Sequence, residues 1–198
     1  MELIDAYDHG VAIATKSDLI VRDIDILCSI QRTAPVVCKL TITTVDDDLA
    51  SRLEPGAPLP NARLAALERL SKAGLFTGVL LMPVLPFVED SDENVLSVVE
   101  SAARAGARFV YAALGVTMRQ GQREYFLDGL ERMFPGKGLK ERYLRQYGDR
   151  YQCAAPRAKK LWETFTTACQ ERGILYDMKS IDRAATLGYG DRQITFFD

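Results

Sequence analysis

The chain has 198 residues, 47% of them hydrophobic, and its 25 Lys and Arg residues against 27 Asp and Glu residues give a formal charge of −2. This length suffices for one domain with its own core, and the near-neutral charge excludes a general electrostatic attraction to nucleic acid or anionic lipid. The first ten residues lack the basic flank and apolar stretch of a signal peptide, and no apolar run reaches membrane-spanning length. We therefore expect a cytoplasmic protein.

Predicted strands and helices alternate along the first part of the chain. Apolar runs predict four strands, at 10–14, 36–44, 76–85 and 109–114. Apolar residues at helical spacing predict the three intervening helices, at 19–30, 60–73 and 94–105. Because alternation at this spacing requires right-handed crossovers, we expect an α/β fold with a parallel sheet, either open or closed into a barrel.

The alternation stops after Thr117. Residues 119–150 are rich in charged and aromatic side chains, and we expect one or two helices there, laid across the sheet. Residues 156–172 predict an amphipathic helix. Its expected buried side consists of Leu161, Trp162, Phe165 and Cys169.

The cysteines give no indication of a metal site. Cys28, Cys38, Cys153 and Cys169 occur singly in apolar or helical stretches. Disulfide frameworks are dense and zinc sites use closely spaced Cys and His pairs, so we expect reduced thiols that hold no metal. His9, the only histidine, is expected to be a solvated loop residue.

Polar side chains occur where the predicted strands end, which is where parallel α/β folds bind ligands. These side chains are Lys16 and Ser17 after the first strand, and Lys39, Thr41 and Thr43 in the second. A lysine beside hydroxyl groups suits a carboxylate or a phosphate, which predicts a site for an anionic small molecule. The alternative is that Lys16 extends into solvent and the threonines reflect β-propensity.

Three other patterns have a structural and a functional interpretation. The acidic run 46–48 favours a helix cap over a cation site. The basic and aromatic stretch 140–151 favours an amphipathic packing helix over a nucleic-acid groove. The segment from Gln193 to Phe197 is typical either of a peptide that docks on a sliding clamp or of an apolar terminal segment packed on the body.

Several short segments, taken in order, resemble radical S-adenosylmethionine proteins related to spore photoproduct lyase. The segments are 14–19 with Arg22, Asp23 and Asp25, then 41–44, 54–58, Arg63, 73–74, 82–86, Asp90 and 122–125. The resemblance implies a partial six-stranded β/α barrel whose third to sixth strands are the four predicted here. It divides the chain into a partial barrel, 1–117, and a helical C-terminal extension with a tail, 118–198.

The resemblance also implies cofactors and site residues. Members bind S-adenosylmethionine and a 4Fe-4S cluster. The cluster donates an electron, the sulfonium splits, and the resulting 5'-deoxyadenosyl radical abstracts hydrogen from the substrate. Lys16 and Ser17 would face the S-adenosylmethionine carboxylate or ribose, and Thr41 would supply a hydroxyl contact. Thr43 and Pro83 are further candidates for cofactor binding.

One element of the family pattern is missing. The cluster is held by a Cys-x-x-x-Cys-x-x-Cys loop, and this chain has no such run. We therefore expect the C-terminal part of such a lyase, similar to the DNA-repair group of the family and inactive without the cluster. Its expected substrate is a nucleic acid or a nucleotide-like molecule. We also expect association, for example as a homo-oligomer, through an open edge of the sheet.

Two alternatives remain. A lysine at a strand end, Lys16 or Lys39, can form a Schiff base in an aldolase-type barrel. The chain can also be a non-catalytic binding module, recruited through its clamp-like C-terminal peptide.

Overall fold

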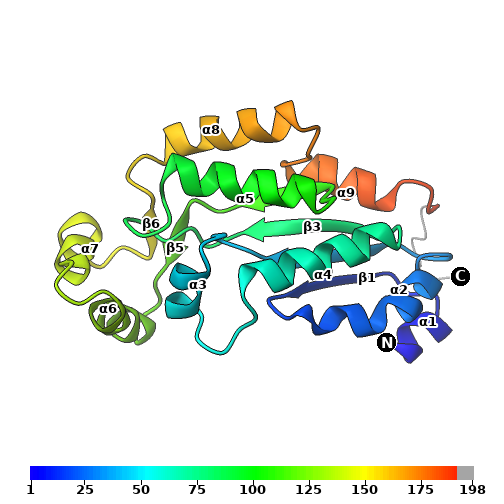
Figure 1. Ribbon diagram of the computed structural model, residues 1–198, viewed down its shortest axis with the longest axis horizontal. Helices are drawn as coiled ribbons and strands as arrows, with labels where there is room; N and C mark the ends of the chain where they lie inside the picture. Colours follow the sequence, from blue (N-terminus) through cyan, green and yellow to red (C-terminus); the bar gives the residue numbers. More distant parts are fainter. Residues whose placement is uncertain (191–198) are drawn as a thin grey trace, which may run out of the picture.

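The computed structural model describes residues 1–190, and a four-stranded parallel sheet in the order β1-β2-β3-β4 lies at its centre (Figure 1). The strands are β1 (Val11–Thr15), β2 (Val36–Thr41), β3 (Phe76–Leu81) and β4 (Phe109–Ala112). The register places Ile13 opposite Cys38 and Cys38 opposite Thr77. The expected α/β fold with a parallel sheet is confirmed.

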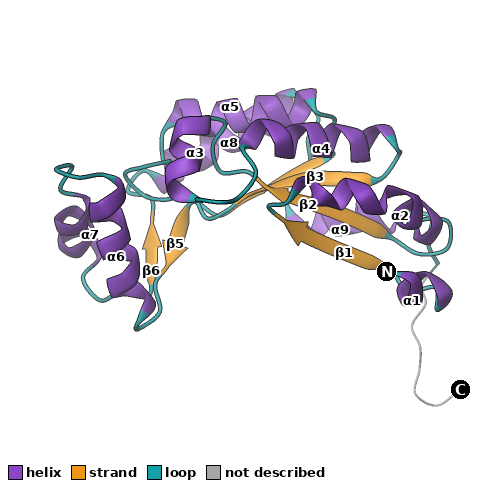
Figure 2. Ribbon diagram, turned by 60° about the horizontal axis from the view of Figure 1, so that its bottom comes forward, coloured by secondary structure: helices purple, strands orange, loops and turns teal. Residues whose placement is uncertain are grey.

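Helices cover one face of this sheet (Figure 2). They are the 3-10 helix η1 (Asp18–Asp23) and the α-helices α2 (Ile24–Ile30), α4 (Pro60–Lys72), α5 (Asp92–Arg104) and α8 (Ala158–Glu171). Their apolar stripes join alternate strand residues in one core, which includes Leu27, Leu67, Val98 and Phe165 with Leu40 and Val79. This main layer is built from the periodic part of the sequence.

The opposite face of the sheet, which we call the bare face, carries the intervening strand residues. Ala12 and Ala14 on the edge strand β1 are exposed, and Lys39 and Thr41 on β2 are only half-buried. Gly78 lies on this face opposite Phe109, and a Cβ atom there would come within 2.5 Å of the Phe109 ring. Among the described residues, no strand pairs with the outer edge of β1.

The ends of several elements differ from the prediction. Strand β2 stops at Thr41 and β3 at Leu81, and Pro83, which lacks an N–H donor, follows β3 after one residue. The helix predicted from 19 to 30 is divided into η1 and α2, in a segment where β-branched residues lower the helix propensity. The predicted cap at 46–48 is confirmed, since Asp46 accepts hydrogen bonds from Asp48 N and Leu49 N at the start of α3 (Asp47–Leu53).

A second, smaller unit follows β4, and we call it the end cluster. It combines the antiparallel pair β5 (Gly115–Thr117) and β6 (Gln152–Ala154) with α6 (Gln122–Met133) and α7 (Leu139–Tyr147). Its buried residues are Met118, Leu127, Leu130, Leu139, Tyr143, Tyr147 and Cys153. Figure 1 shows α6 and α7 beyond the tips of the strands, at the far end of the molecule from α1 (Glu2–Ala6).

The expectation that these helices lie across the sheet is therefore wrong, although two helices are present. Their apolar faces cover each other and the β5–β6 pair, which leaves no apolar face for the sheet. The chain then returns, and α8 packs on α5. The division at residue 117 stays a prediction.

The predicted buried side of α8 is wrong at one residue, because Trp162 was expected to be buried and is 42% exposed. It lies at the rim of an aromatic group with Phe165 and Tyr176. Beyond α8, Leu175 forms an isolated parallel β-bridge with Phe109 of β4. The helix α9 (Met178–Thr186) then leads back toward α2. There the Tyr189 hydroxyl donates a hydrogen bond to the Gln31 carbonyl at 2.6 Å.

Within residues 1–190, no helix combines the length and apolar character that crossing a membrane requires.

Candidate functional site

The candidate site lies where β1, β2 and β3 end. Residues Lys16 and Ser17 follow β1 directly, and the Ser17 amide donates to the Thr15 hydroxyl at 2.9 Å. The Ser17 hydroxyl accepts a hydrogen bond from Leu19 N at 3.2 Å and so caps η1. Lys16 is thereby placed in a hydrogen-bonded turn, from which its side chain reaches across the strand ends to Glu54.

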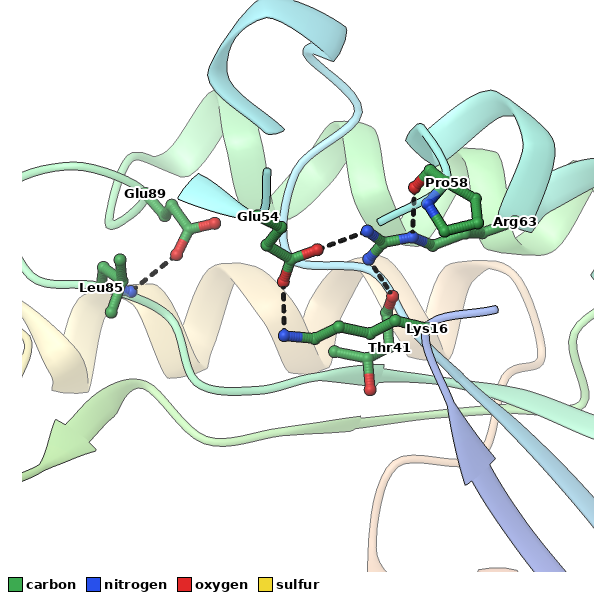
Figure 3. A network of polar contacts seen from close by, with 7 residues as sticks. All are labelled: Lys16, Thr41, Glu54, Pro58, Arg63, Leu85 and Glu89. Atoms are coloured by element: carbon green, nitrogen blue, oxygen red, sulfur yellow. Dashed lines mark hydrogen bonds and ion pairs between the residues drawn. The ribbon is translucent and has the colours of Figure 1, made fainter. Parts of the chain in front are cut away.

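An ion-pair network joins Lys16 to a buried arginine (Figure 3). The Lys16 ammonium lies 2.7 Å from Glu54 Oε1, and the other oxygen of Glu54 pairs with the Arg63 guanidinium. The side chain of Lys16 is 46% exposed, whereas that of Arg63 is 2% exposed. One end of the network is therefore open to solvent and the other belongs to the core.

Arg63 connects three segments of the chain. Besides Glu54, it donates from Nε to the Pro58 carbonyl at 2.7 Å and from Nη1 to the Thr41 carbonyl at 2.9 Å. A buried guanidinium needs such a full set of acceptors, because an unpaired charge in the core costs several kcal/mol. The end of β2 and the loop between α3 and α4 are thus fixed to the first turn of α4.

Glu89 is the second carboxylate of the site, and it is buried. Its Oε2 accepts a hydrogen bond from Leu85 N at 3.0 Å, while Oε1 has no hydrogen-bond partner among the described residues. Burial raises the pKa of Glu89 to about 6, and the nearby Glu54 carboxylate raises it further, against the lowering effects of the Thr43 hydroxyl, the Leu85 amide and Lys16. Glu89 is therefore the group of this site that titrates near neutral pH.

The predicted site residues fall into two groups. The first group is Lys16, Ser17 and Thr41, which lie together at the C-terminal ends of β1 and β2. We call this edge the mouth of the sheet. The Thr41 carbonyl accepts a hydrogen bond from Arg63 there. Thr43 is buried beside Glu89, and its carbonyl accepts from Asn94 Nδ2 at 2.8 Å.

The other candidates lie apart from that group. Pro83 is exposed after β3, and the Met82–Pro83 peptide bond is cis. Lys39 lies farther back on the bare face between Ala14 and Gly78, and has no ion pair within residues 1–190. The Schiff-base hypothesis stays a prediction.

Sequence reasoning missed the roles of Glu54, Arg63 and Glu89. The first two appeared only as landmarks of the resemblance, and their contact joins residues nine positions apart on different elements. Glu89 follows the apolar stretch 84–88, and a carboxylate directly after such a stretch was the available signal.

The loop that carries Glu89 is also fixed by the end cluster. The Tyr143 hydroxyl of α7 donates to the Pro86 carbonyl at 2.9 Å, and the Arg142 guanidinium lies 4.0 Å from the Phe87 ring centroid. The Phe87 amide donates to Asp90 Oδ1 at 2.7 Å. The end cluster therefore contributes to the position of Glu89.

None of the cysteines is disulfide-bonded, and burial raises the pKa values of Cys38 and Cys169 to about 12. A thiol must lose its proton to bind a metal, so burial disfavours ligation by these two residues. Among residues 1–190, no group of three or more His, Cys, Asp or Glu side chains is placed to hold a metal ion. The residues that the structure describes therefore do not fit a 4Fe-4S cluster.

No protein-family model matches the chain. Uncharacterized proteins of Mycobacterium tuberculosis and Mycobacterium bovis are each 33% identical over 137 residues, which cover 69% of this chain and 39% of each relative. An uncharacterized protein of Acidianus two-tailed virus is 31% identical over 52% of this chain and 34% of its own length. The chain thus spans well under half the length of these relatives.

Solved structures give a broader match. Spore photoproduct lyase complexed with dinucleoside spore photoproduct matches with a TM-score of 0.62 at 19% identity, over 88% of this chain and 53% of that chain. A variant of this enzyme with bound AdoMet and dinucleoside spore photoproduct matches with a TM-score of 0.59 at the same identity and coverage. Over that length, the chain has the fold of spore photoproduct lyase, in agreement with the sequence resemblance.

Proposed function

We propose that this chain binds S-adenosylmethionine at the C-terminal edge of its sheet, as the cofactor-lining part of a radical S-adenosylmethionine lyase. The observation that carries the proposal is the half-exposed Lys16 ammonium, held by Glu54 at the end of β1. The fold supports it, because a solved structure with this fold contains bound AdoMet.

The chemistry of the site fits the carboxylate end of this ligand. An ammonium group has three N–H donors, and Glu54 Oε1 takes one of them, so donors remain for an incoming carboxylate. Ser17 and Thr41 add hydroxyl groups within the same mouth of β1 and β2. Arg63 keeps Glu54, and through it Lys16, in one position.

The cluster chemistry does not follow for this chain, because its described residues supply no cluster ligands. The activity that we propose for these residues is therefore the binding of S-adenosylmethionine, not its cleavage. Hydrogen abstraction belongs to the proposal only for a protein that also holds a cluster.

For the substrate, we propose a nucleic acid or a nucleotide-like molecule. The segment 115–154, which contains the end cluster, has eight Lys and Arg against five Asp and Glu residues, a net charge of +3 in a chain of −2. Tyr125 and Tyr151 are exposed on it, as base-stacking contacts require. The neighbour with the same fold is complexed with dinucleoside spore photoproduct, which agrees with this class of substrate.

The experiment is calorimetric titration of the full chain with S-adenosylhomocysteine, a stable ligand that carries the same carboxylate. We expect wild-type binding and a loss of at least tenfold in affinity for Lys16→Met, because the charge-assisted hydrogen bond disappears. Lys72→Met is the matched control, since Lys72 is 73% exposed on α4. Absence of wild-type binding, or equal affinities for wild type and Lys16→Met, would refute the proposal.

A further inference from the structure

Four charged side chains meet at the mouth of the sheet, from four different segments. They are Lys16 after β1, Glu54 between α3 and α4, Arg63 in α4 and Glu89 between β3 and α5. Figure 3 shows the Glu89 carboxyl group beside Glu54, while Leu85 N binds its other side. Lys16 is the exposed member of the group.

Glu89 stands out because its surroundings favour the neutral form. The residue is 1% exposed, and its Oε1 lacks a partner among the described residues. A buried carboxylate with an unsatisfied oxygen is costly when charged, and burial raises its pKa to about 6. The three hydrogen bonds of Arg63 go to Glu54 and to two carbonyls, and none goes to Glu89.

The other groups around Glu89 do not offer it a compensating charge. Thr43, after β2, and Asn94, in α5, are neutral, and Asn94 Nδ2 donates to the Glu89 carbonyl at 3.0 Å. Tyr143 in α7 is a neutral phenol whose pKa is raised by burial. Asp90, on the same loop, adds a negative charge, and its carboxylate accepts a hydrogen bond from Phe87 N. Lys16 is therefore the cation whose charge acts on Glu89, and it lowers the Glu89 pKa while its ammonium pairs with Glu54.

We propose that protonation of Glu89 controls the affinity of the Lys16 site for an anionic ligand. When Glu89 is neutral, the charges of Lys16, Arg63 and Glu54 sum to +1, which favours binding of a carboxylate. When Glu89 is ionised, the sum is zero, and Glu89 and the ligand compete for the Lys16 ammonium. The inference rests on the proposed function, because it assigns the anion to the carboxylate of an S-adenosylmethionine-type ligand.

The sign of the pH dependence follows directly. The pKa of about 6 makes Glu89 mostly neutral at pH 5 and mostly ionised at pH 7. An added unit charge about 4 Å from the ligand changes affinity by about a thousandfold at an effective dielectric constant of ~20, so the anion binds almost only to the form with neutral Glu89. The share of that form falls about tenfold from pH 5 to pH 7. The anionic ligand should therefore bind about tenfold more tightly at pH 5 than at pH 7.

The test measures binding by calorimetry at pH 5, 6 and 7 with two ligands. S-adenosylhomocysteine keeps its carboxylate and ammonium charges in this range, whereas adenosine has no anionic group. The variants are wild type, Glu89→Gln, which is always neutral, and Glu93→Gln, a matched change at an exposed position in the first turn of α5.

We expect S-adenosylhomocysteine to bind wild type and Glu93→Gln about tenfold more tightly at pH 5 than at pH 7. Glu89→Gln should bind at pH 7 with the affinity that wild type has at pH 5, and adenosine binding should not change with pH. A pH-independent wild-type affinity, or equal pH dependence in Glu89→Gln, would overturn the inference and leave the proposed function standing.

Other outcomes separate the two proposals. If Glu89→Gln weakens binding at every pH, Glu89 is a direct ligand contact and the inference is wrong. If wild type binds S-adenosylhomocysteine at no pH, the proposed function itself fails. Should Glu89→Gln not fold, the wild-type titration still tests the inference, because a pH-independent affinity for S-adenosylhomocysteine would overturn it.

Discussion

The main layer and the end cluster are stabilised in different ways. The main layer packs aliphatic side chains of strands against those of helices, as at Leu40, Val79 and Val98. The end cluster packs Tyr143 against Phe87, Phe126 and Tyr147, with ring centroids 5.2 to 5.5 Å apart. The regular layer therefore supplies the strand ends of the site, while the end cluster holds the loop that carries Glu89.

The largest expected effect concerns the buried end of the ion-pair network. Arg63→Met should lower the free energy of unfolding by about 4 kcal/mol, because it leaves Glu54 and two carbonyl groups without their donor. Urea denaturation measures this, with exposed Arg69→Met on the same helix as the control. A loss below about 1 kcal/mol would show that Arg63 does not hold the main layer together.

The next prediction asks whether the two regions unfold separately. Leu130→Ala removes a fully buried side chain of the end cluster and should cost about 3 kcal/mol. Hydrogen exchange should then speed up in α6 and α7 and stay slow in β1 to β4. Leu70→Ala, an equally buried change in α4, should instead speed up exchange in the sheet. Equal acceleration everywhere for both variants would mean one cooperative unit.

A smaller effect concerns the proton on Glu89, which lies where the two regions meet. The folded state holds this proton more tightly than the unfolded chain, since burial raises the pKa from 4.5 to about 6. Stability should therefore fall as pH rises from about 4.5 through 6, by about 2 kcal/mol in total. Glu89→Gln should remove this loss in denaturation measured at several pH values. The same loss in Glu89→Gln would assign the pH dependence to another group.

The smallest effect lies on the surface of the main layer, between α5 and α8. Asp92 accepts a hydrogen bond from the Thr164 hydroxyl at 2.9 Å, which lowers its pKa, and Lys160 and Arg157 act in the same direction. Its contribution is present above about pH 4 and is lost as pH falls. Asp92→Asn should cost under about 1 kcal/mol at pH 7 and leave stability unchanged at low pH, as thermal unfolding can show. A larger cost at low pH than at pH 7 would contradict this sign.

Local sequence patterns were sufficient to predict most helices and strands of the main layer. Ser17, Asp46 and Ser91 each cap the start of a helix with a side-chain oxygen, and Gly74 and Gly106 follow the ends of α4 and α5 with positive φ. These features depend on neighbours within four residues. The period of the apolar residues set the order of strands and helices for the same reason.

The features that sequence reasoning missed depend on contacts between distant segments. The placement of α7 depends on a hydrogen bond from Tyr143 to Pro86, 57 residues away. The pairing of Lys16 with Glu54 joins two loops, and the unpaired oxygen of Glu89 is defined only by what surrounds it. Lys16, Ser17 and Thr41 were found because the ends of parallel strands meet at one edge. The segment from Gln193 to Phe197 lies outside the described residues, so its clamp-like docking stays a prediction, as does association through β1.

We propose that the mouth of the sheet beside Lys16 binds the anionic end of an S-adenosylmethionine-type ligand. A crystal structure of the chain with S-adenosylhomocysteine would show whether it does. We predict that the ligand carboxylate lies within hydrogen-bond distance of the Lys16 ammonium, with Glu54 still bound to Arg63. The contrary result is a ligand bound elsewhere at saturating concentration. One such place is the cavity between the first residues and α9, which is lined by Tyr7, His9, Arg32, Arg183 and Tyr189.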